Sequence, residues 1–350
     1  MQAKDDIFRL LLEKSAEVVQ KAQCGLIVQP GAIGDCILTL PVARFMKDRL
    51  KLGSVDMLGH MEYISFLPGR SCVDGVRSID SVPLHRLFVK PDSLELEDKD
   101  PLINFFAGYT WIVSFLAEPD SNFEQNLIFT ANCSHSAEVI TLAMKPSGSY
   151  SRHIMEYYAE QLVAQSGFLV EGEHAGPTGN LIRPGESDTR TGKELMGQLQ
   201  VDTVKKLVVI QPGSGSVEKC WHLENFLAVA RRLAAEGFEV LFLLGPAELE
   251  RFGEADISRM EAAAGCARGL SLPQVLGLLS CAFGFAGNDS GVSHLAAGLG
   301  IRTATVFGPS DSVLYRPVGP CVTVLRDATP DFGKKPSAKL QNELVHALTA

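Results

Sequence analysis

The segment 287–295 reads Gly-Asn-Asp-Ser-Gly-Val-Ser-His-Leu and directly follows a short apolar stretch. Polar side chains crowded where a strand passes into a helix can hold a charged ligand, because the free amides of a helix N-terminus favour anions. Asp289 and Ser290 also fit a plain helix cap, and His294 fits a buried core histidine equally well. The segment therefore indicates an anion-binding turn, with a capped helix as the structural alternative.

A second polar turn, Gly-Ser-Gly-Ser at 213–216, follows another apolar stretch and precedes Lys219. Glycines let the backbone approach an anion, hydroxyls donate hydrogen bonds, and a lysine supplies the charge that a diphosphate requires. Gly-Ser turns are common, and a solvated lysine is the plain alternative for Lys219. The spacing excludes a Walker loop, and Gly31 with Gly34 does not complete the G-x-G-x-x-G dinucleotide pattern.

Both turns lie where the pattern places a buried strand before an amphipathic helix. Nearly continuous apolar strands that alternate with helices predict parallel sheets covered on both faces. Ligands bind such sheets beyond the carboxyl ends of the strands. Two series of this kind predict two doubly wound domains. The expected strands are 24–28, 111–116, 181–182, 207–210, 240–244, 283–287 and 303–307, and the expected helices include 1–20, 38–50, 290–299 and 337–348.

The composition is that of a soluble globular protein, with 46% apolar and 21% charged residues in 350. A formal net charge of -9 argues against a nucleic-acid binder and gives no general attraction to anionic membranes. The eight cysteines form no Cys-x-x-Cys pair, which favours reduced thiols and a cytoplasmic protein. The uncharged apolar run 102–117 is shorter than the ~18–20 residues that cross a bilayer.

Several motifs, in their order along the chain, resemble glycosyltransferase family 9, the ADP-heptose:lipopolysaccharide heptosyltransferase family. The resemblance implies a GT-B fold, in which two Rossmann-like domains face each other across a cleft. It also implies inverting, metal-independent transfer of a sugar, with a heptose expected, from an ADP-sugar to a lipopolysaccharide-core or related envelope acceptor, without a cofactor. The motifs are Ile33-Gly34-Asp35, Gly213-Ser-Gly-Ser with Lys219 and Trp221, Gly245-Pro246-x-Glu248, segment 287–295, and Phe307-Gly308-Pro309-Ser310-Asp311.

By this resemblance the chain divides into an acceptor-side domain, 1–185, and a nucleotide-sugar-binding domain, 186–330. The remaining residues, 331–350, are expected to form a helix that packs back towards the N-terminal domain. The boundary lies in a stretch rich in glycine, proline and polar residues.

The resemblance also assigns roles to single residues. Asp35 resembles the family's catalytic base, with an N-cap of the helix expected over 38–50 as the structural alternative, and Lys219 resembles the lysine that binds the diphosphate. Glu248 resembles the residue that binds the ribose hydroxyls, and Asp289 the acid that holds the donor sugar. The donor and nucleotide site is predicted from Gly213, Ser214, Gly215, Ser216, Gly245, Glu248, Asn288, Asp289, Ser290, Gly291 and His294, the acceptor-side loop from Gly31 and Gly34, and no metal ligand is predicted.

Two other functions fit the same donor site. A GT-B-type nucleotide-sugar epimerase or hydrolase would release the sugar to water, and a nucleotide-sugar-binding protein would not turn over. The expected partners are a nucleotide-sugar donor and a lipid-linked or oligosaccharide acceptor, without nucleic acid. The expected location is the cytoplasm, with peripheral contact to the inner membrane left open, as are the donor sugar, the acceptor hydroxyl and the oligomeric state.

Overall fold

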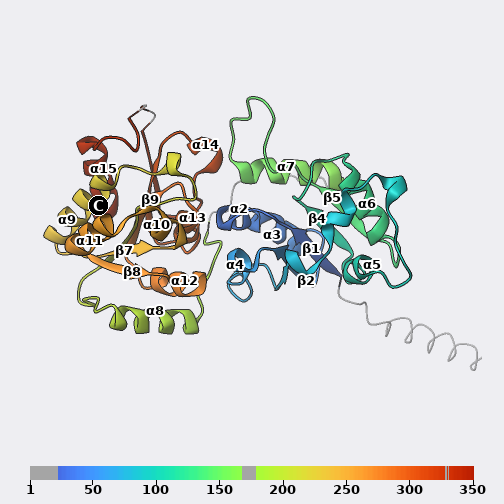
Figure 1. Ribbon diagram of the computed structural model, residues 1–350. Coiled ribbons are helices and arrows are strands. Elements are labelled where there is room, and N and C mark those ends of the chain that lie inside the picture. The colour runs from blue at the N-terminus through green and yellow to red at the C-terminus, as the bar shows by residue number, and fades with distance from the viewer. Residues whose placement is uncertain (1–22, 168–178, 328, 330) are drawn as a thin grey trace, which may run out of the picture.

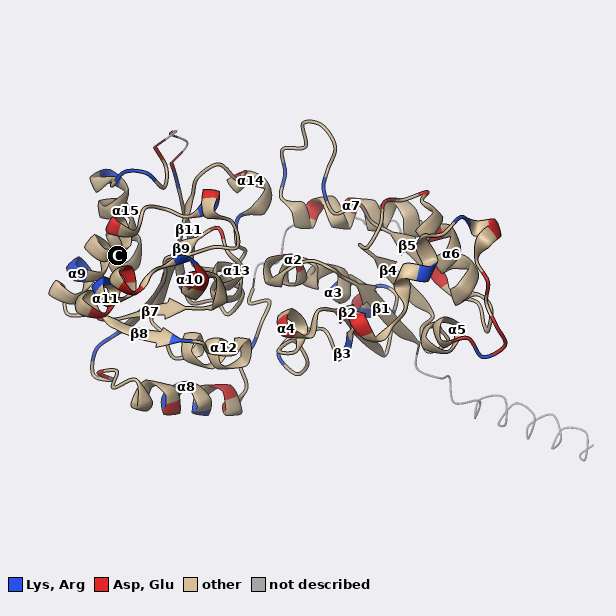
Figure 2. Ribbon diagram, viewed as in Figure 1, with Lys and Arg blue, Asp and Glu red and all other residues tan. Residues whose placement is uncertain are grey.

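The computed structural model describes residues 23–167, 179–327, 329 and 331–350, which form two α/β domains side by side (Figure 1). The helix expected over 1–20 lies outside the described residues. Within the described ranges, no helix combines the length and the apolar character needed to cross a membrane. Lys, Arg, Asp and Glu residues are spread mostly over the helices and loops of both domains (Figure 2).

The N-terminal domain contains a parallel sheet of five strands in its described part, in the order β3-β2-β1-β4-β5. The central strand β1 is buried from Gly25 to Val28, since helices cover the sheet. The strands are β1 (Cys24–Val28), β2 (Ser54–Gly59), β3 (Gly75–Ser78), β4 (Trp111–Ser114) and β5 (Glu138–Thr141), and the α-helices are α2 (Ile33–Leu38), α3 (Leu40–Asp48), α4 (Met61–Ile64), α5 (Pro101–Phe106), α6 (Asn122–Ala131) and α7 (Ile154–Ser166).

The C-terminal domain contains a second parallel sheet, with six strands in the described residues and the order β11-β10-β9-β6-β7-β8. The two sheets confirm the expected pair of doubly wound domains. The strands are β6 (Leu207–Gln211), β7 (Glu239–Leu244), β8 (Gly265–Arg268), β9 (Gly284–Asn288), β10 (Arg302–Phe307) and β11 (Val322–Arg326), and the α-helices are α8 (Glu186–Gln198), α9 (Leu223–Ala235), α10 (Pro246–Arg251), α11 (Glu254–Ala263), α12 (Leu272–Ser280), α13 (Gly291–Gly298), α14 (Ser312–Tyr315) and α15 (Ala338–Thr349).

The strand order places the two polar turns of the C-terminal domain next to each other. β6 pairs in parallel with β9, so the turn that follows β6 and the turn that follows β9 leave the same edge of the sheet. The strand order reverses its direction at this pair, because β7 lies on the other side of β6. Such a switch point is where open α/β sheets bind ligands.

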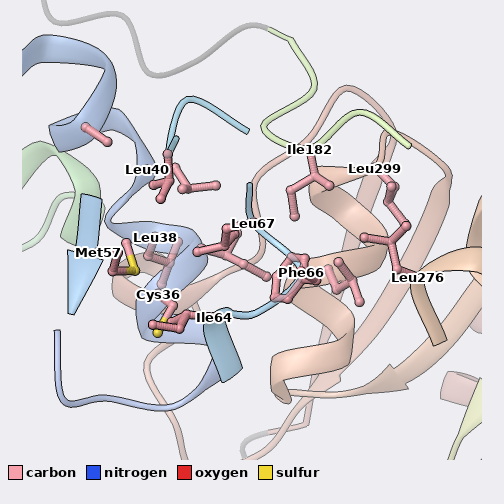
Figure 3. Packing of buried hydrophobic residues seen from close by; sticks show 14 of the residues in the cluster. Cys36, Leu38, Leu40, Met57, Ile64, Phe66, Leu67, Ile182, Leu276 and Leu299 are labelled. Carbon is pink, nitrogen blue, oxygen red and sulfur yellow. The ribbon is translucent and has the colours of Figure 1, made fainter. Parts of the chain in front are cut away.

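An apolar core continues from one domain into the other. Phe66 and Leu67, which follow α4, belong to the same buried cluster as Ile182, Leu276 and Leu299 of the C-terminal side (Figure 3). Helices α2 and α13 also pack directly against each other at the domain junction (Figure 1). Apolar packing therefore contributes to the relative position of the domains.

Two local expectations about the N-terminal and linker segments are wrong. The helix expected over 38–50 begins earlier, at Ile33, and is interrupted at Thr39, where α2 ends and α3 begins. The Thr39 hydroxyl donates to the Asp35 carbonyl at 2.8 Å, and Pro41 follows closely. Residues 181–182 form no strand, although the Ile182 amide donates to the Gly298 carbonyl at 3.0 Å.

The expectation for the last helix is also wrong. α15 does not return to the N-terminal domain but packs on α9 and on strands β9 to β11. Leu344 and Leu348 are fully buried there, within the core of the C-terminal domain. A stripe of apolar residues shows that a helix is amphipathic, but the stripe alone does not show which surface covers it.

Candidate active site

Asn288 shapes the floor of the candidate site. Its side-chain amide donates to the carbonyls of Pro212 (2.8 Å) and Gly213 (3.1 Å), and its oxygen accepts from the Trp221 amide at 2.9 Å. The residue is fully buried, so these bonds use its polar atoms inside the protein. Asn288, predicted to bind the donor, thus holds the 213–216 turn against the end of β9. Trp221 itself is buried and packs against Phe226.

Lys219 and Asp289 form a charged pair next to Asn288. The Lys219 ammonium is 2.7 Å from the Asp289 carboxylate, and the Ser214 hydroxyl donates to the Asp289 carbonyl at 2.6 Å. The Asp289 side chain is 5% exposed, whereas that of Lys219 is 39% exposed. Ser216 starts the short 3-10 helix that carries Lys219. The lysine is therefore positioned by a buried carboxylate and still reaches solvent.

Ser290 fulfils the structural expectation of a helix cap. Its hydroxyl oxygen accepts from the Ser293 amide at 3.3 Å at the start of α13, and the hydroxyl donates to Gln211 at 2.8 Å. Gln211 in turn donates to Glu248 at 3.2 Å. The cap leaves the first amides of α13 directed towards the end of the sheet, where they can donate to an anion.

Glu248 is 1% exposed and is held by the backbone as well as by Gln211. Its carboxylate accepts from the Gly245 amide at 2.8 Å at the start of α10. Burial raises the pKa of this carboxyl, and the Gly245 amide partly opposes that effect. Gly213 lies so close that a Cβ there would stand 2.0 Å from Glu248 Oε1.

A cavity of about 680 Å³ opens beside Glu248 and is lined by both domains. Its volume lies within the range usual for small-molecule sites. The lining contains both apolar side chains, such as those of Leu244, Leu270 and Val275, and polar side chains, such as those of Gln211 and Ser214, so an apolar base and a hydroxylated sugar would both find suitable neighbours. The lining includes Ala32, Ile33, Glu62, Tyr63 and Ser65 from the N-terminal domain and Gln211, Ser214, Gly215, Leu244, Gly245, Glu248, Leu270, Leu272, Val275, Ser290 and Gly291 from the C-terminal domain.

Asp35 faces the charged pair from the other domain. Its carboxylate accepts from the Ala32 amide at 2.9 Å, but Asp35 is the third residue of α2, whose N-cap is Ala32. The structural alternative, in which Asp35 is the N-cap of a helix over 38–50, is therefore wrong, because that helix begins earlier than expected. Burial raises the pKa of Asp35, and the positive charges of Lys219 and Lys145 act in the opposite direction. The negative charge of Asp289 raises the Asp35 pKa further. These influences place Asp35 in the electrostatic field of Lys219 and Asp289.

His294 is buried at the contact between the domains and is 4% exposed. A Cβ added at Gly34 would lie 3.0 Å from its ring, so Gly34 lets α2 approach the imidazole. Burial lowers the pKa of His294 to about 4, and the ring is neutral near pH 7. His294 therefore brings no positive charge to the site. Gly31 similarly gives room to the Asp35 side chain, whose Cβ would be 2.6 Å from a Cβ at that position.

The structure thus gathers the predicted residues into two adjoining groups. Gly215, Gly245, Glu248, Ser290 and Gly291 line the cavity. Asp35, Lys219, Asp289 and His294 form a charged and polar group at the domain junction, and Ser214 belongs to both through its bond to the Asp289 backbone. Among the residues that the structure describes, no three or more His, Cys, Asp or Glu side chains are arranged to hold a metal ion.

Sequence reasoning missed several contributors. Gln211 connects Glu248 to Ser290, and Arg251 donates to the Ser214 carbonyl at 3.0 Å. Glu62 and Tyr63 line the cavity from the opposite domain. The position of Gln211 at the end of a buried strand was a usable signal. The other three have no local pattern that distinguishes them from ordinary surface residues.

The C-terminal half of the chain is similar in sequence to a known protein family. Residues 174–344 match the sequence model of "Glycosyltransferase family 9 (heptosyltransferase)". Lipopolysaccharide heptosyltransferase 3 from Escherichia coli is 33% identical over 119 residues, which cover 31% of this chain and 33% of that protein. The same-named protein of strain K12 is 31% identical over 113 residues. The matched segment therefore spans about a third of the length of these relatives.

Solved structures resemble most of the chain, in both of its domains. A family 9 glycosyl transferase from Veillonella parvula has a TM-score of 0.66 at 17% identity, covering 87% of this chain and 86% of the other. The E. coli ADP-heptose lps heptosyltransferase II has a TM-score of 0.65 at 16% identity, covering 93% and 98%. An E. coli heptosyltransferase with ADP has a TM-score of 0.62 at 17% identity, covering 93% and 100%. These similarities, together with the two parallel sheets, show the GT-B fold.

Proposed function

We propose that this chain, whose residues 174–344 match the sequence model of glycosyltransferase family 9, is an enzyme that transfers a sugar from an ADP-sugar to a glycan acceptor. The single observation that carries the proposal is the meeting of Lys219, Asp289 and the start of α13 beside a cavity that both domains line. A nucleoside fits the cavity, and its diphosphate would extend towards the lysine.

The donor site is proposed as follows. The base contacts the apolar side chains of the cavity lining, and Glu248 accepts hydrogen bonds from the ribose hydroxyls. The diphosphate approaches Lys219 and the first amides of α13, which favour negative charge. Ser214 and Gly215 lie between these two regions, since both line the cavity and Ser214 bonds to Asp289. The donor would then compete with Asp289 for the lysine.

The proposed reaction is a single displacement. The Asp35 carboxylate takes the proton from the acceptor hydroxyl, and the hydroxyl oxygen forms a bond to the anomeric carbon as the bond to the diphosphate breaks. Lys219 stabilises the negative charge that develops on the leaving diphosphate. As the family resemblance implies, the displacement inverts the anomeric centre and requires no metal. Asp289 positions the donor sugar and Lys219.

The proposed substrates follow from the similar proteins. Two of them are named for ADP-heptose or bind ADP, and the curated relatives are lipopolysaccharide heptosyltransferases. We therefore propose ADP-heptose as the donor and a sugar of the lipopolysaccharide core, or of a related envelope glycan, as the acceptor. A lipid-linked acceptor would bring the protein to the cytoplasmic face of the inner membrane.

The decisive experiment follows the donor sugar. The protein is incubated with ADP-heptose in the presence and absence of truncated lipopolysaccharide, and ADP release and the attachment of the sugar are measured together. The proposal predicts acceptor-dependent ADP release with the heptose bound to the acceptor. Release of free heptose at the same rate without acceptor would identify a hydrolase instead, and binding of ADP-heptose without turnover would identify a binding protein.

Asp35→Asn provides the matched test of mechanism. The substitution retains an oxygen that can accept from the Ala32 amide, so the cap of α2 remains. Loss of the general base should lower kcat by about 10²- to 10⁴-fold. Calorimetric affinity for ADP should stay unchanged. Transfer at the wild-type rate in this variant would remove Asp35 from the mechanism.

A further inference from the structure

His153 lies at a contact between the two domains, away from the cavity. It precedes α7 in the N-terminal domain, and its ring is 4% exposed. Nε2 lies 2.9 Å from the carbonyl oxygen of Arg316, which follows α14 in the C-terminal domain. Nδ1 accepts from the Met155 amide at 3.3 Å, at the start of α7. The imidazole thus has one partner in each domain.

These two hydrogen bonds determine which nitrogen of the His153 ring carries the proton. Nδ1 accepts a hydrogen bond and carries no proton, so the proton is on Nε2 and is donated to the Arg316 carbonyl. Burial and the nearby Arg316 charge lower the pKa of His153, whereas the Arg316 carbonyl and Glu156 act in the opposite direction. The ring is therefore the neutral tautomer that both bonds require.

The segments next to His153 and next to Arg316 both contain a tyrosine that interacts electrostatically with Asp35. α7 carries Tyr158, which is 2% exposed and whose phenol feels the charge of Asp35. Tyr315 immediately precedes Arg316, and its phenol also feels the charge of Asp35. A bond between His153 and Arg316 therefore links the two segments that border the proposed base from opposite domains.

We propose that His153 is a positioning residue that holds the two domains in the relative orientation in which Asp35 faces the donor site. This inference rests on the proposed function. The Nε2 bond to Arg316 does the positioning, while the Nδ1 bond only caps α7. The two roles belong to different atoms, so different substitutions can separate them.

Two neutral variants separate the bonds. His153→Asn places an amide oxygen near the position of Nδ1, so the variant retains the cap of α7 and loses the donor to Arg316. His153→Gln extends its amide donor towards the position of Nε2, so it retains the interdomain bond and weakens the cap. His346→Gln serves as the control, because His346 is an exposed residue of the C-terminal helix.

The expected results are opposite for the two variants. His153→Asn should lower kcat for transfer by about ten- to a hundredfold, as a small misplacement of reacting groups does, with ADP affinity within about twofold of wild type. His153→Gln should retain kcat within about threefold. A purely structural role as a helix cap predicts the reverse, with Gln the more damaging substitution, and that result would overturn the proposal.

A measurement without substrates keeps this test independent of the proposed reaction. Small-angle X-ray scattering of the ligand-free proteins should show a larger radius of gyration for His153→Asn than for wild type, His153→Gln or His346→Gln. Circular dichroism confirms that each variant is folded. Equal scattering from both His153 variants and wild type would overturn the positioning role. Absent transfer by the wild type, with the scattering difference present, would overturn only the proposed function.

Discussion

In Asp35 a structural role and the proposed chemical role belong to one carboxylate. Its oxygen accepts from the Ala32 amide and so begins α2, while the same group lies in the field of Lys219, Lys145 and Asp289. The cap fixes the carboxylate at the start of the helix, and the charges around it set how easily it takes a proton. Capping therefore does not argue against a catalytic role at this position.

The charges around Asp35 predict how kcat for the proposed transfer depends on pH. Burial raises its pKa, and the base form is lost as the pH falls through that raised value. The positive charge of Lys145, in the N-terminal domain, lowers the Asp35 pKa. In Lys145→Met the Asp35 pKa should rise, so the acid limb of the kcat–pH profile should move to higher pH.

The pH profile of Lys145→Met is measured at saturating donor, beside Lys47→Met as control. Lys47 forms an ion pair with Asp74 and does not figure among the charges that act on Asp35. The control should keep the wild-type profile, and ADP affinity should be unchanged in both variants. An acid limb at the same pH in Lys145→Met and wild type would contradict the proposed electrostatic contact.

The turn that follows β6 contains two glycines, Gly213 and Gly215, whose surroundings differ. A Cβ at Gly213 would stand 2.0 Å from Glu248 Oε1 and 2.8 Å from its Cγ, whereas a Cβ at Gly215 would meet nothing within 4 Å. Gly213→Ala must therefore displace a buried carboxylate that also bonds to Gly245 and Gln211. We expect ADP affinity to fall by about tenfold or more, the loss of roughly one hydrogen bond to a charged group.

Calorimetry with ADP tests this expectation, with Gly215→Ala as the control from the same turn. The Gly215 variant should bind within about threefold of wild type. If the two variants bind ADP equally well, Glu248 is not part of the nucleotide site. Thermal unfolding of both variants shows whether a loss of affinity comes from the site or from the whole domain.

The elements that the sequence predicts well are those buried on both faces. The apolar runs at 24–28, 207–210 and 240–244 match β1, β6 and β7 within a residue or two at each end, because central strands of a covered parallel sheet have little polar surface. The break between α2 and α3 was missed, since it depends on Thr39 and on the course of the backbone. The polar turns were located from their residue types.

What the sequence did not provide were the contacts between distant segments. No local sequence pattern predicts the packing of α15 on the C-terminal sheet or the hydrogen bond between His153 and Arg316. Each contact joins segments that are far apart in the chain. The same holds for Glu62 and Tyr63 in the cavity wall. The family resemblance predicted that the two polar turns bind the donor, and in the structure Asn288 and Ser290 of these turns are hydrogen-bonded largely within the protein.

At the scale of the whole molecule, two glycines let the domains touch. Gly34 on α2 accommodates the His294 ring, and Gly291 on α13 accommodates Ile33 of α2. A Cβ at Gly291 would lie 2.7 Å from the Ile33 Cβ, which is attached directly to the helix backbone and cannot rotate away. The larger residue can fit only if α2 and α13 separate, and with them the domains.

Gly291→Ala should therefore hold the domains further apart and lower transfer. Ligand-free scattering should show a larger radius of gyration, and kcat should fall by about ten- to a hundredfold, because Asp35 no longer faces the donor at the required distance. Gly253→Ala is the control, since a Cβ there meets nothing within 4 Å. Scattering and kcat identical to wild type in Gly291→Ala would mean that α2 and α13 are not closely packed in solution, and the common site of the two domains would then lack its physical basis.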